Sequence, residues 1–141
     1  MQIKKNILVI SSSSKTGGGP SHIFTINNLL ADKINFYYAM PFSKSLKGRF
    51  DFKSFLFIKE RKISIIDIVR LIIFIKKNSI NIIHSHGKGA GVIGRLLKFF
   101  LNKPLIYTYH GIHIKCLSSF KRFIYILYEN LFSWIDDHKI F

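Results

Sequence analysis

Residues 80–114, INIIHSHGKGAGVIGRLLKFFLNKPLIYTYHGIHI, decide the fold of this chain. The stretch joins two short apolar runs through a glycine-rich loop and a helical segment, which is the pattern of strand, helix and strand. Parallel strands need a crossover connection, and a helix of this length supplies one. Histidines next to small residues follow each apolar run, at His84, His86 and His110. Ligands of open α/β sheets bind beyond the carboxyl ends of the strands, so this stretch predicts the functional edge of the molecule.

The rest of the chain continues the same alternation in both directions. The pattern predicts strands at 6–12, 36–40, 52–58, 81–84, 105–109 and 139–141, and helices from about residue 21 and at 63–77, 89–101 and 119–134. Such an order predicts an α/β fold with a doubly wound, Rossmann-like and mostly parallel sheet, with helices on both faces. We expect one domain over residues 1–141, truncated at the start of its last strand.

Helical spacing supports the helices at 63–77 and 89–101, and for the second it also predicts the buried side. In the helix at 63–77 the repeat consists of Ile65, Ile66, Val69, Ile72, Ile73 and Lys76. In the helix at 89–101 the predicted inner side consists of Val92, Ile93, Leu96, Leu97 and Phe100.

The chain is strongly basic, with 22 Lys and Arg against 7 Asp and Glu and a formal net charge of +15. Such a charge can indicate nucleic acid or an anionic membrane as partner. A second interpretation is genomic, because Lys, Ile, Asn and Phe are abundant together, as AT-rich coding DNA would produce. No nucleic-acid-binding motif accompanies the charge, so we expect no nucleic acid partner. Interleaved basic and large apolar side chains favour peripheral contact with the membrane surface.

Cysteine content and apolar run length bear on the compartment. The single cysteine, Cys116, excludes an internal disulfide and a zinc site built on paired cysteines. The apolar run after Lys5 is shorter than a signal-peptide core, and the run at 63–75 is interrupted by polar residues and is too short to cross a bilayer. We therefore expect a cytoplasmic protein that does not span the membrane and binds its cytoplasmic face peripherally.

The first candidate binding element is the loop around Gly17, Gly18 and Gly19, between the first strand and the first helix. Glycines there let the backbone approach a ligand, with N–H groups of the helix N-terminus facing it. The loop matches neither the dinucleotide-binding fingerprint nor the P-loop. A connection without a ligand is the alternative.

The second candidate is the segment from His84 to Gly91. On a strand His84 and His86 point the same way and could form half of a metal site, but no third ligand is evident. His84 is equally consistent with a structural residue that ends the strand. His86 and Lys88, followed by glycines ahead of a helix, suit an anionic or sugar ligand. Tight packing of the helix on the sheet is the alternative reason for Gly89 and Gly91.

The third candidate is His110 with Gly111, at the end of the next strand. A histidine there can donate a hydrogen bond to a phosphate or hydroxyl, or transfer a proton. A purely structural histidine is the alternative. Glu129, late in the last helix, is expected to be solvated, and its spacing from Asp137 is attributed to chance.

Taken together, these segments resemble the N-terminal half of a GT-B glycosyltransferase of family 4. The resemblance covers nearly the whole chain, and four features carry it in order: the glycine loop, the His84–His86 strand end with its small-residue helix through Arg95, the Thr108–Gly111 segment, and the Glu129 helix leading to a new strand. Each motif alone is weak, and their order and spacing are more specific.

The resemblance implies a retaining enzyme with two Rossmann-like domains that face each other across a cleft. The N-terminal domain would recognise a glycan or polyprenyl-linked acceptor in cell-surface polysaccharide synthesis, and the C-terminal one a nucleotide-sugar donor. It implies that Gly17, Gly18 and Gly19 approach the donor phosphates and that His110, before Gly111, lies near the donor sugar. His86 and Lys88 map to the acceptor side. No metal or other cofactor is implied, since basic groups stabilise the leaving diphosphate.

The sequence also departs from this family. Gly19-Pro20-Ser21-His22 replaces the usual Gly-Gly-Ala-Glu, so the acid of that motif is absent. Residues 1–141 contain no donor domain, so we expect a separately encoded C-terminal domain as partner and little or no activity of this chain alone. The alternative is a catalytically inactive fragment that acts as a basic binding domain for a membrane or a protein.

Overall fold

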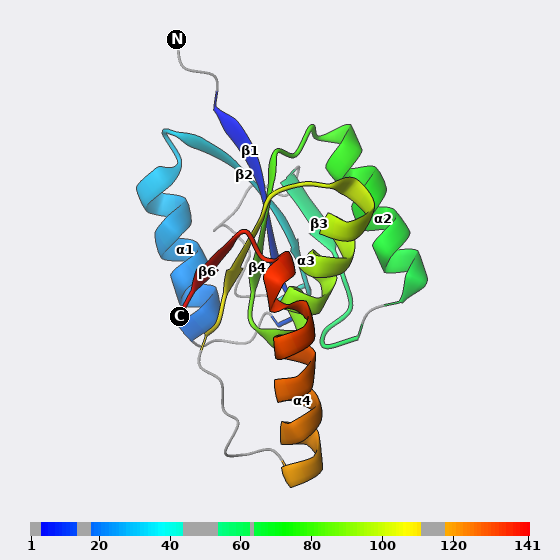
Figure 1. Ribbon diagram of the computed structural model, residues 1–141. Coiled ribbons are helices and arrows are strands. Elements are labelled where there is room, and N and C mark those ends of the chain that lie inside the picture. Colours follow the sequence, from blue (N-terminus) through cyan, green and yellow to red (C-terminus); the bar gives the residue numbers. More distant parts are fainter. Residues whose placement is uncertain (1–3, 14–17, 44–53, 63, 111–117) are drawn as a thin grey trace.

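The computed structural model describes residues 4–13, 18–43, 54–62, 64–110 and 118–141 (Figure 1). The elements are, in chain order, β1 (Lys5–Ser11), α1 (Gly18–Leu30), β2 (Ile34–Met40), β3 (Phe55–Phe57), α2 (Ile65–Lys77), β4 (Ile82–His86), α3 (Lys88–Leu101), β5 (Leu105–Thr108), α4 (Ser119–Phe132), the short 3₁₀ helix η4 (Ser133–Ile135) and β6 (His138–Ile140). Every predicted element is present and in the predicted order, although several boundaries shift by a few residues.

The six strands form one parallel sheet in the order β3-β2-β1-β4-β5-β6. The predicted α/β, doubly wound, Rossmann-like fold is therefore confirmed. The chain winds outward in one direction from β1 and in the other from β4, so the switch point lies between these two strands. At that point Ser11 of β1 pairs with His86 of β4, and His86 in turn pairs with Thr108 of β5. The predicted strand at 81–84 thus runs two residues further, which brings His86 into the sheet.

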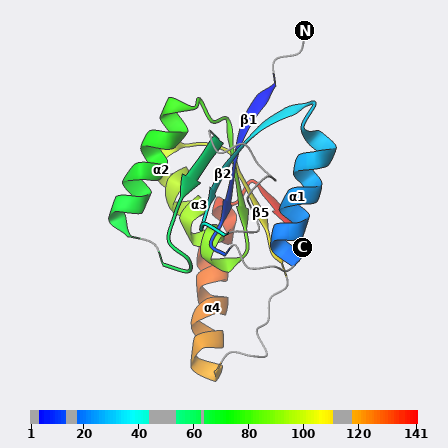
Figure 2. The same cartoon turned by 180° about the vertical axis from the view of Figure 1, so that it is seen from behind.

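Helices cover both faces of the sheet, as predicted. Figure 1 shows α1 on one side and α2 and α3 on the other, and Figure 2 shows the same layers from behind. The larger core, on the side of α2 and α3, contains Leu8, Ile10, Leu71, Ile83 and Leu97 among others. The smaller core, on the side of α1, contains Val9, Ile23, Tyr38, Met40 and Phe55. Consecutive residues of β1 thus supply opposite cores, as the pleat of a strand requires.

The apolar repeat of α2 does not coincide with its buried face. Four residues of the repeat are exposed, namely Ile65, Ile66, Val69 and Ile73. The buried residues are instead Asp67, Ile68, Leu71 and Ile75. A capping box begins this helix, because the Ser64 side chain accepts from the Asp67 backbone while the Asp67 carboxylate accepts from the Ser64 backbone. This cap gives the buried Asp67 its partners, and Ile68, Leu71 and Ile75 pack in the core on the same side.

The predicted inner face of α3 is right for Ile93 and Leu97 and wrong for its other members. Val92, Leu96 and Phe100 are 46, 40 and 58% exposed. Small residues lie against the sheet instead. A Cβ on Gly94 would come within 2.1 Å of Ser85 Oγ, and one on Gly91 within 2.5 Å of the Tyr107 ring. The glycines therefore let α3 approach the sheet, and this packing also accounts for Gly91 in the sequence.

Helix α4 differs from the other helices because none of its residues is buried. In Figure 1 it extends beyond the carboxyl edge of the sheet. Its large apolar side chains, among them Phe120, Phe123 and Leu131, are 73, 61 and 55% exposed. Among the described residues no helix has the length and apolar character needed to cross a membrane.

Candidate functional site

Four histidines gather at the carboxyl edge of the sheet, on the face that α1 covers. This histidine cluster consists of His22 from α1, His84 and His86 from β4, and His110 just beyond β5. Ile83 and Ser85 alternate with the two β4 histidines and face α3, so strand geometry places His84 and His86 on the same side. Their ring centroids are 4.0 Å apart.

Hydrogen bonds give the members of the cluster different roles. His84 Nε2 lies 2.8 Å from Thr108 Oγ1, inside the sheet, which agrees with a structural role. His86 Nδ1 lies 2.7 Å from His110 Nε2, so the two rings share one proton along this contact. The His22 ring meets the His110 ring edge-on, with centroids 5.2 Å apart. The structure therefore joins His86 to His110, which the sequence placed in separate motifs.

Burial keeps the inner histidines neutral. Burial first, and the neighbouring histidines second, lower the pKa of His84 to about 4 and that of His86 to about 2. Burial also lowers the pKa of His110, with His22 as the second cause. At neutral pH His84, His86 and His110 are therefore uncharged imidazoles that can donate and accept hydrogen bonds.

The glycine loop meets the cluster at its last residue. A Cβ built on Gly19 would lie 3.5 Å from His110 Cδ2, so the first turn of α1 runs alongside the His110 ring. Gly18 is the first residue of α1, three residues earlier than predicted. Gly17 and Gly111 lie outside the described residues. Of the predicted site residues, His86, His110 and Gly19 are thus brought together.

Lys88 is not part of this group. It is the first residue of α3, and its ammonium stands 4.5 Å from the centroid of the Tyr125 ring of α4. Ile83, Ser85 and α3 mark the face of the sheet opposite the histidine cluster, so Lys88 and His86 serve different surfaces.

Sequence reasoning missed an ion-pair network around Arg95 of α3. The Arg95 side chain is 3% exposed and reaches Glu129 and Asp136, each at 2.7 Å. Tyr109 donates to the same Glu129 carboxylate at 2.8 Å. The expectation of a solvated Glu129 is therefore wrong, because α3 passes beneath α4 and supplies the buried cation. An arginine in a glycine-rich helix, followed by acids in the next helix, is the only trace of this network in the sequence.

The structure offers no metal site in the part of the chain it describes, where no three suitable side chains converge on one point. The pair formed by His84 and His86 is engaged with Thr108 and His110 instead. The cluster can bind a polar ligand at its rim, orient it and move a proton.

The family model of Glycosyltransferase Family 4 matches residues 16–139. Comparison with curated proteins gives no match. The family match takes in the histidine cluster, the Arg95 network and every strand except β1.

Solved structures share the fold at low sequence identity. HepE from Anabaena, in complex with UDP and glucose, has a TM-score of 0.65 and 16% identity over 91% of this chain and 36% of its own. MurG from Acinetobacter baumannii has a TM-score of 0.63 and 11% identity over 96% and 45%. A protein from Listeria monocytogenes described as a UDP-N-acetylglucosamine 2-epimerase has a TM-score of 0.57 and 15% identity over 98% and 39%. The chain spans less than half the length of each of these proteins, and their common fold is the GT-B fold.

Proposed function

The chain belongs to glycosyltransferase family 4, and we propose that it forms the N-terminal, acceptor-side half of a retaining GT-B enzyme that takes its sugar from a nucleotide-sugar donor. Membership of the family supports a transferase. The observation that carries the proposal is the contact of His86 with His110 beside the first turn of α1. Two strand ends and a helix N-terminus thus supply hydrogen-bond donors at one edge, where open α/β sheets bind ligands.

His110 is the proposed catalytic residue. In the proposed arrangement His86 donates from Nδ1 to His110 Nε2, which leaves the proton of His110 on its Nδ1. That N–H then donates to the donor sugar or to its diphosphate. During transfer the bond between sugar C1 and the diphosphate oxygen breaks, the acceptor oxygen bonds to C1, and the hydroxyl proton of the acceptor passes to the departing diphosphate oxygen. A hydrogen-bond donor such as the His110 N–H, held near the departing oxygen, stabilises the negative charge that develops on that oxygen.

The backbone at Gly18 and Gly19 has a supporting role in this proposal. The first turn of α1 has no acidic residue, and N–H groups at a helix N-terminus favour an anion. The donor diphosphate would lie there, next to the His110 ring. The C-terminal half, which would hold the nucleotide, is proposed to come from a second domain, encoded separately or in a longer form of this chain.

We further propose that the acceptor is a glycan precursor or a polyprenyl-linked sugar of cell-surface polysaccharide synthesis, met at the cytoplasmic face of the membrane. The exposed apolar side chains of α4 and the net charge of +15 support contact with an anionic, partly apolar surface. The HepE structure with UDP and UDP-glucose supports a UDP-sugar as the first donor class to test.

Reconstitution tests the proposal. The chain is combined with the second GT-B domain encoded next to it, and labelled UDP-sugars are offered with a lipid extract as acceptor source. Transfer that needs both halves is the expected result. No transfer by the complete pair, together with salt-sensitive binding to anionic vesicles by this chain, would support the second candidate, a non-catalytic basic binding domain.

A further inference from the structure

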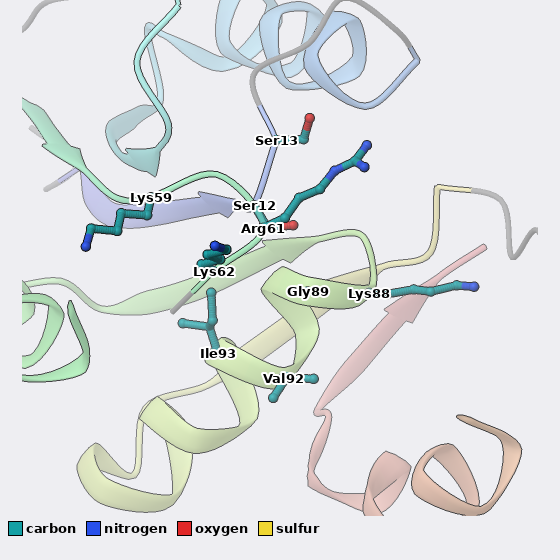
Figure 3. A pocket seen from close by; sticks show the side chains of 9 residues that line it. All are labelled: Ser12, Ser13, Lys59, Arg61, Lys62, Lys88, Gly89, Val92 and Ile93. Atoms are coloured by element: carbon teal, nitrogen blue, oxygen red, sulfur yellow. The ribbon is translucent and has the colours of Figure 1, made fainter. Parts of the chain in front are cut away.

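A second polar site lies on the other face of the sheet, in a pocket of about 610 Å³ that the histidine cluster does not reach. We call it the basic pocket. It is lined by Ser12, Ser13, Lys59, Arg61, Lys62, Lys88, Gly89, Val92 and Ile93 (Figure 3). Four of these residues are cationic, and none is acidic. A volume of this size suits a small ligand rather than a single ion.

Lys59, Arg61 and Lys62, which follow β3, supply most of the charge, and the backbone of Arg61 is tied to β1. Arg61 has a φ of 51°, in the left-handed region that residues other than glycine seldom adopt. Its N–H donates to the Ser12 carbonyl at 3.0 Å, which ties this segment to the end of β1. Arg61, which has this seldom-adopted backbone conformation, also contributes a guanidinium to the basic pocket. Backbone strain of this kind is found preferentially at binding sites.

Side-chain directions leave the middle of the basic pocket open. Figure 3 shows Arg61 extended toward Ser13, with Lys62 near Ile93, while Lys59 and Lys88 point outward on opposite sides. Arg61 and Lys62 both line the pocket, Arg61 on the side of Ser13 and Lys62 on the side of α3. Guanidinium and ammonium groups from one loop can bind two oxygens of a phosphate, the guanidinium in a bidentate manner.

The first turn of α3 completes the pocket from the opposite side. The N-cap of α3 is Gly87, which has no side-chain capping bond, and the first turn contains no acidic residue. A Cβ on Gly89 would lie 2.7 Å from Ser12 Oγ, so the absence of a side chain lets the helix start approach that hydroxyl. The floor consists of Val92 and Ile93, which could contact an apolar part of the same ligand.

We propose that the basic pocket binds a phosphate or diphosphate group carried by the acceptor, with Arg61 and Lys62 as its main ligands. The role as acceptor site rests on the proposed function, whereas the anion site stands on the pocket itself. The same chemistry could come from a lipid-linked phosphate or from a soluble sugar phosphate. The donor diphosphate is placed instead at α1, on the face of the histidine cluster.

An NMR titration of the 141-residue chain with inorganic pyrophosphate tests the site, at ionic strength held constant with sodium chloride. We expect shifts of the Ser12, Ser13 and Gly89 amides. We expect binding at least fivefold weaker in the double variant Arg61→Gln/Lys62→Gln, and unchanged in the charge-matched control Lys76→Gln/Lys77→Gln at the other end of α2. Absence of these shifts, or equal weakening in both double variants, would overturn the proposal.

Two further arms identify the source of the phosphate. Phosphatidylcholine vesicles with and without phosphatidic acid represent a lipid-borne group, and glucose 1-phosphate represents a soluble one. If Arg61→Gln/Lys62→Gln loses binding to the phosphatidic acid vesicles and the control does not, the source is a lipid. If the same variant loses only the binding of glucose 1-phosphate, the source is a soluble sugar phosphate. In His110→Ala the pyrophosphate-induced shifts of the Ser12, Ser13 and Gly89 amides should remain, because these amides report the basic pocket and not the donor site at α1. Failure of the basic pocket and failure of the transferase proposal therefore give different results.

Discussion

His86 Nδ1 and His110 Nε2 lie 2.7 Å apart, although 24 residues separate them in the sequence. The contact exists because β4 and β5 are neighbours in register, with His86 opposite Thr108 and His110 two residues further along. A shared proton between two neutral imidazoles fixes the tautomer of each. The ring of His86 therefore determines which nitrogen of His110 can donate to a ligand.

The tautomer of His110 should change when His86 is removed. With His86 present we expect the His110 proton on Nδ1, and in His86→Ala we expect it on Nε2. Long-range ¹⁵N–¹H correlation spectra of the chain report this directly. In the reconstituted enzyme the same variant should slow transfer roughly tenfold, the value of one lost hydrogen bond. His84→Gln, on the same strand and face but bonded to Thr108, is the control, and a His110 tautomer that stays unchanged in His86→Ala would refute the assignment.

Arg95 should be the most sensitive ion-pair position in the chain. Replacing it by Met leaves the Asp136 carboxylate, whose side chain is fully buried, without its cation. Breaking a buried pair in this way costs about 3–5 kcal/mol of unfolding free energy. Arg70, half exposed and 3.4 Å from Asp67, provides the matched control, and Arg70→Gln should cost below about 1 kcal/mol. Urea unfolding measures both, and equal losses would contradict a special role for Arg95.

Gly94→Ala should destabilise the chain although alanine is the better helix former. The added methyl would meet Ser85 Oγ at 2.1 Å and Leu105 Cδ1 at 2.8 Å, so α3 must move away from the sheet. Overpacking of this kind costs about 1–3 kcal/mol, more than the gain of about 1 kcal/mol in helix propensity. Ser85→Ala removes the nearer atom and should restore part of the loss in thermal unfolding. A Gly94→Ala chain as stable as the parent would show that α3 is less closely packed than described.

Stability should fall with acidification through the histidine cluster. The pKa of His84 is about 4 and that of His86 about 2 in the folded chain, against an ordinary value of 6.5. A lowered pKa means that the unfolded chain binds the proton first, so stability is full above pH 6.5. It declines from there toward pH 4 for His84, and continues toward pH 2 for His86. Each buried histidine should cost about 2 kcal/mol between pH 7 and pH 5.

Urea midpoints across that pH range measure the effect. The variant His86→Asn removes one titrating group and should reduce the slope of stability against pH by about half. The slope, rather than the absolute stability, is the informative quantity, since the substitution has its own packing cost. An unchanged slope in His86→Asn would show that His86 does not remain neutral in the folded chain.

Much of the fold follows from the sequence because alternation of apolar runs with helical segments leaves one simple arrangement. The position of His110 at a strand end could be predicted in the same way, since Gly111 ends the run. Helix rotation could not be predicted. In α2 the capping-box residue Asp67 is buried while several isoleucines are exposed. In α3 glycines rather than large apolar residues lie against the sheet.

Contacts between distant segments are the other part that sequence reasoning missed. The partners of Arg95 come from α4 and from the segment after η4, 34 and 41 residues away. Arg61 and Lys62 belong to no motif in the sequence, and the bond from the Arg61 N–H to Ser12 is what brings them to the end of β1. In each case the information lies in how strands and helices meet, which no local pattern contains.

His110 is proposed to act in sugar transfer. Substitution of His110 in the reconstituted two-domain enzyme is the most informative test of that role. Initial rates of transfer from the UDP-sugar that the parent pair uses are compared for the parent and for His110→Ala, with thermal unfolding as the check on folding. We expect a loss of about 100-fold or more in kcat with an unchanged Tm. Parent-like turnover by a folded His110→Ala enzyme would show that His110 takes no part in the transfer step.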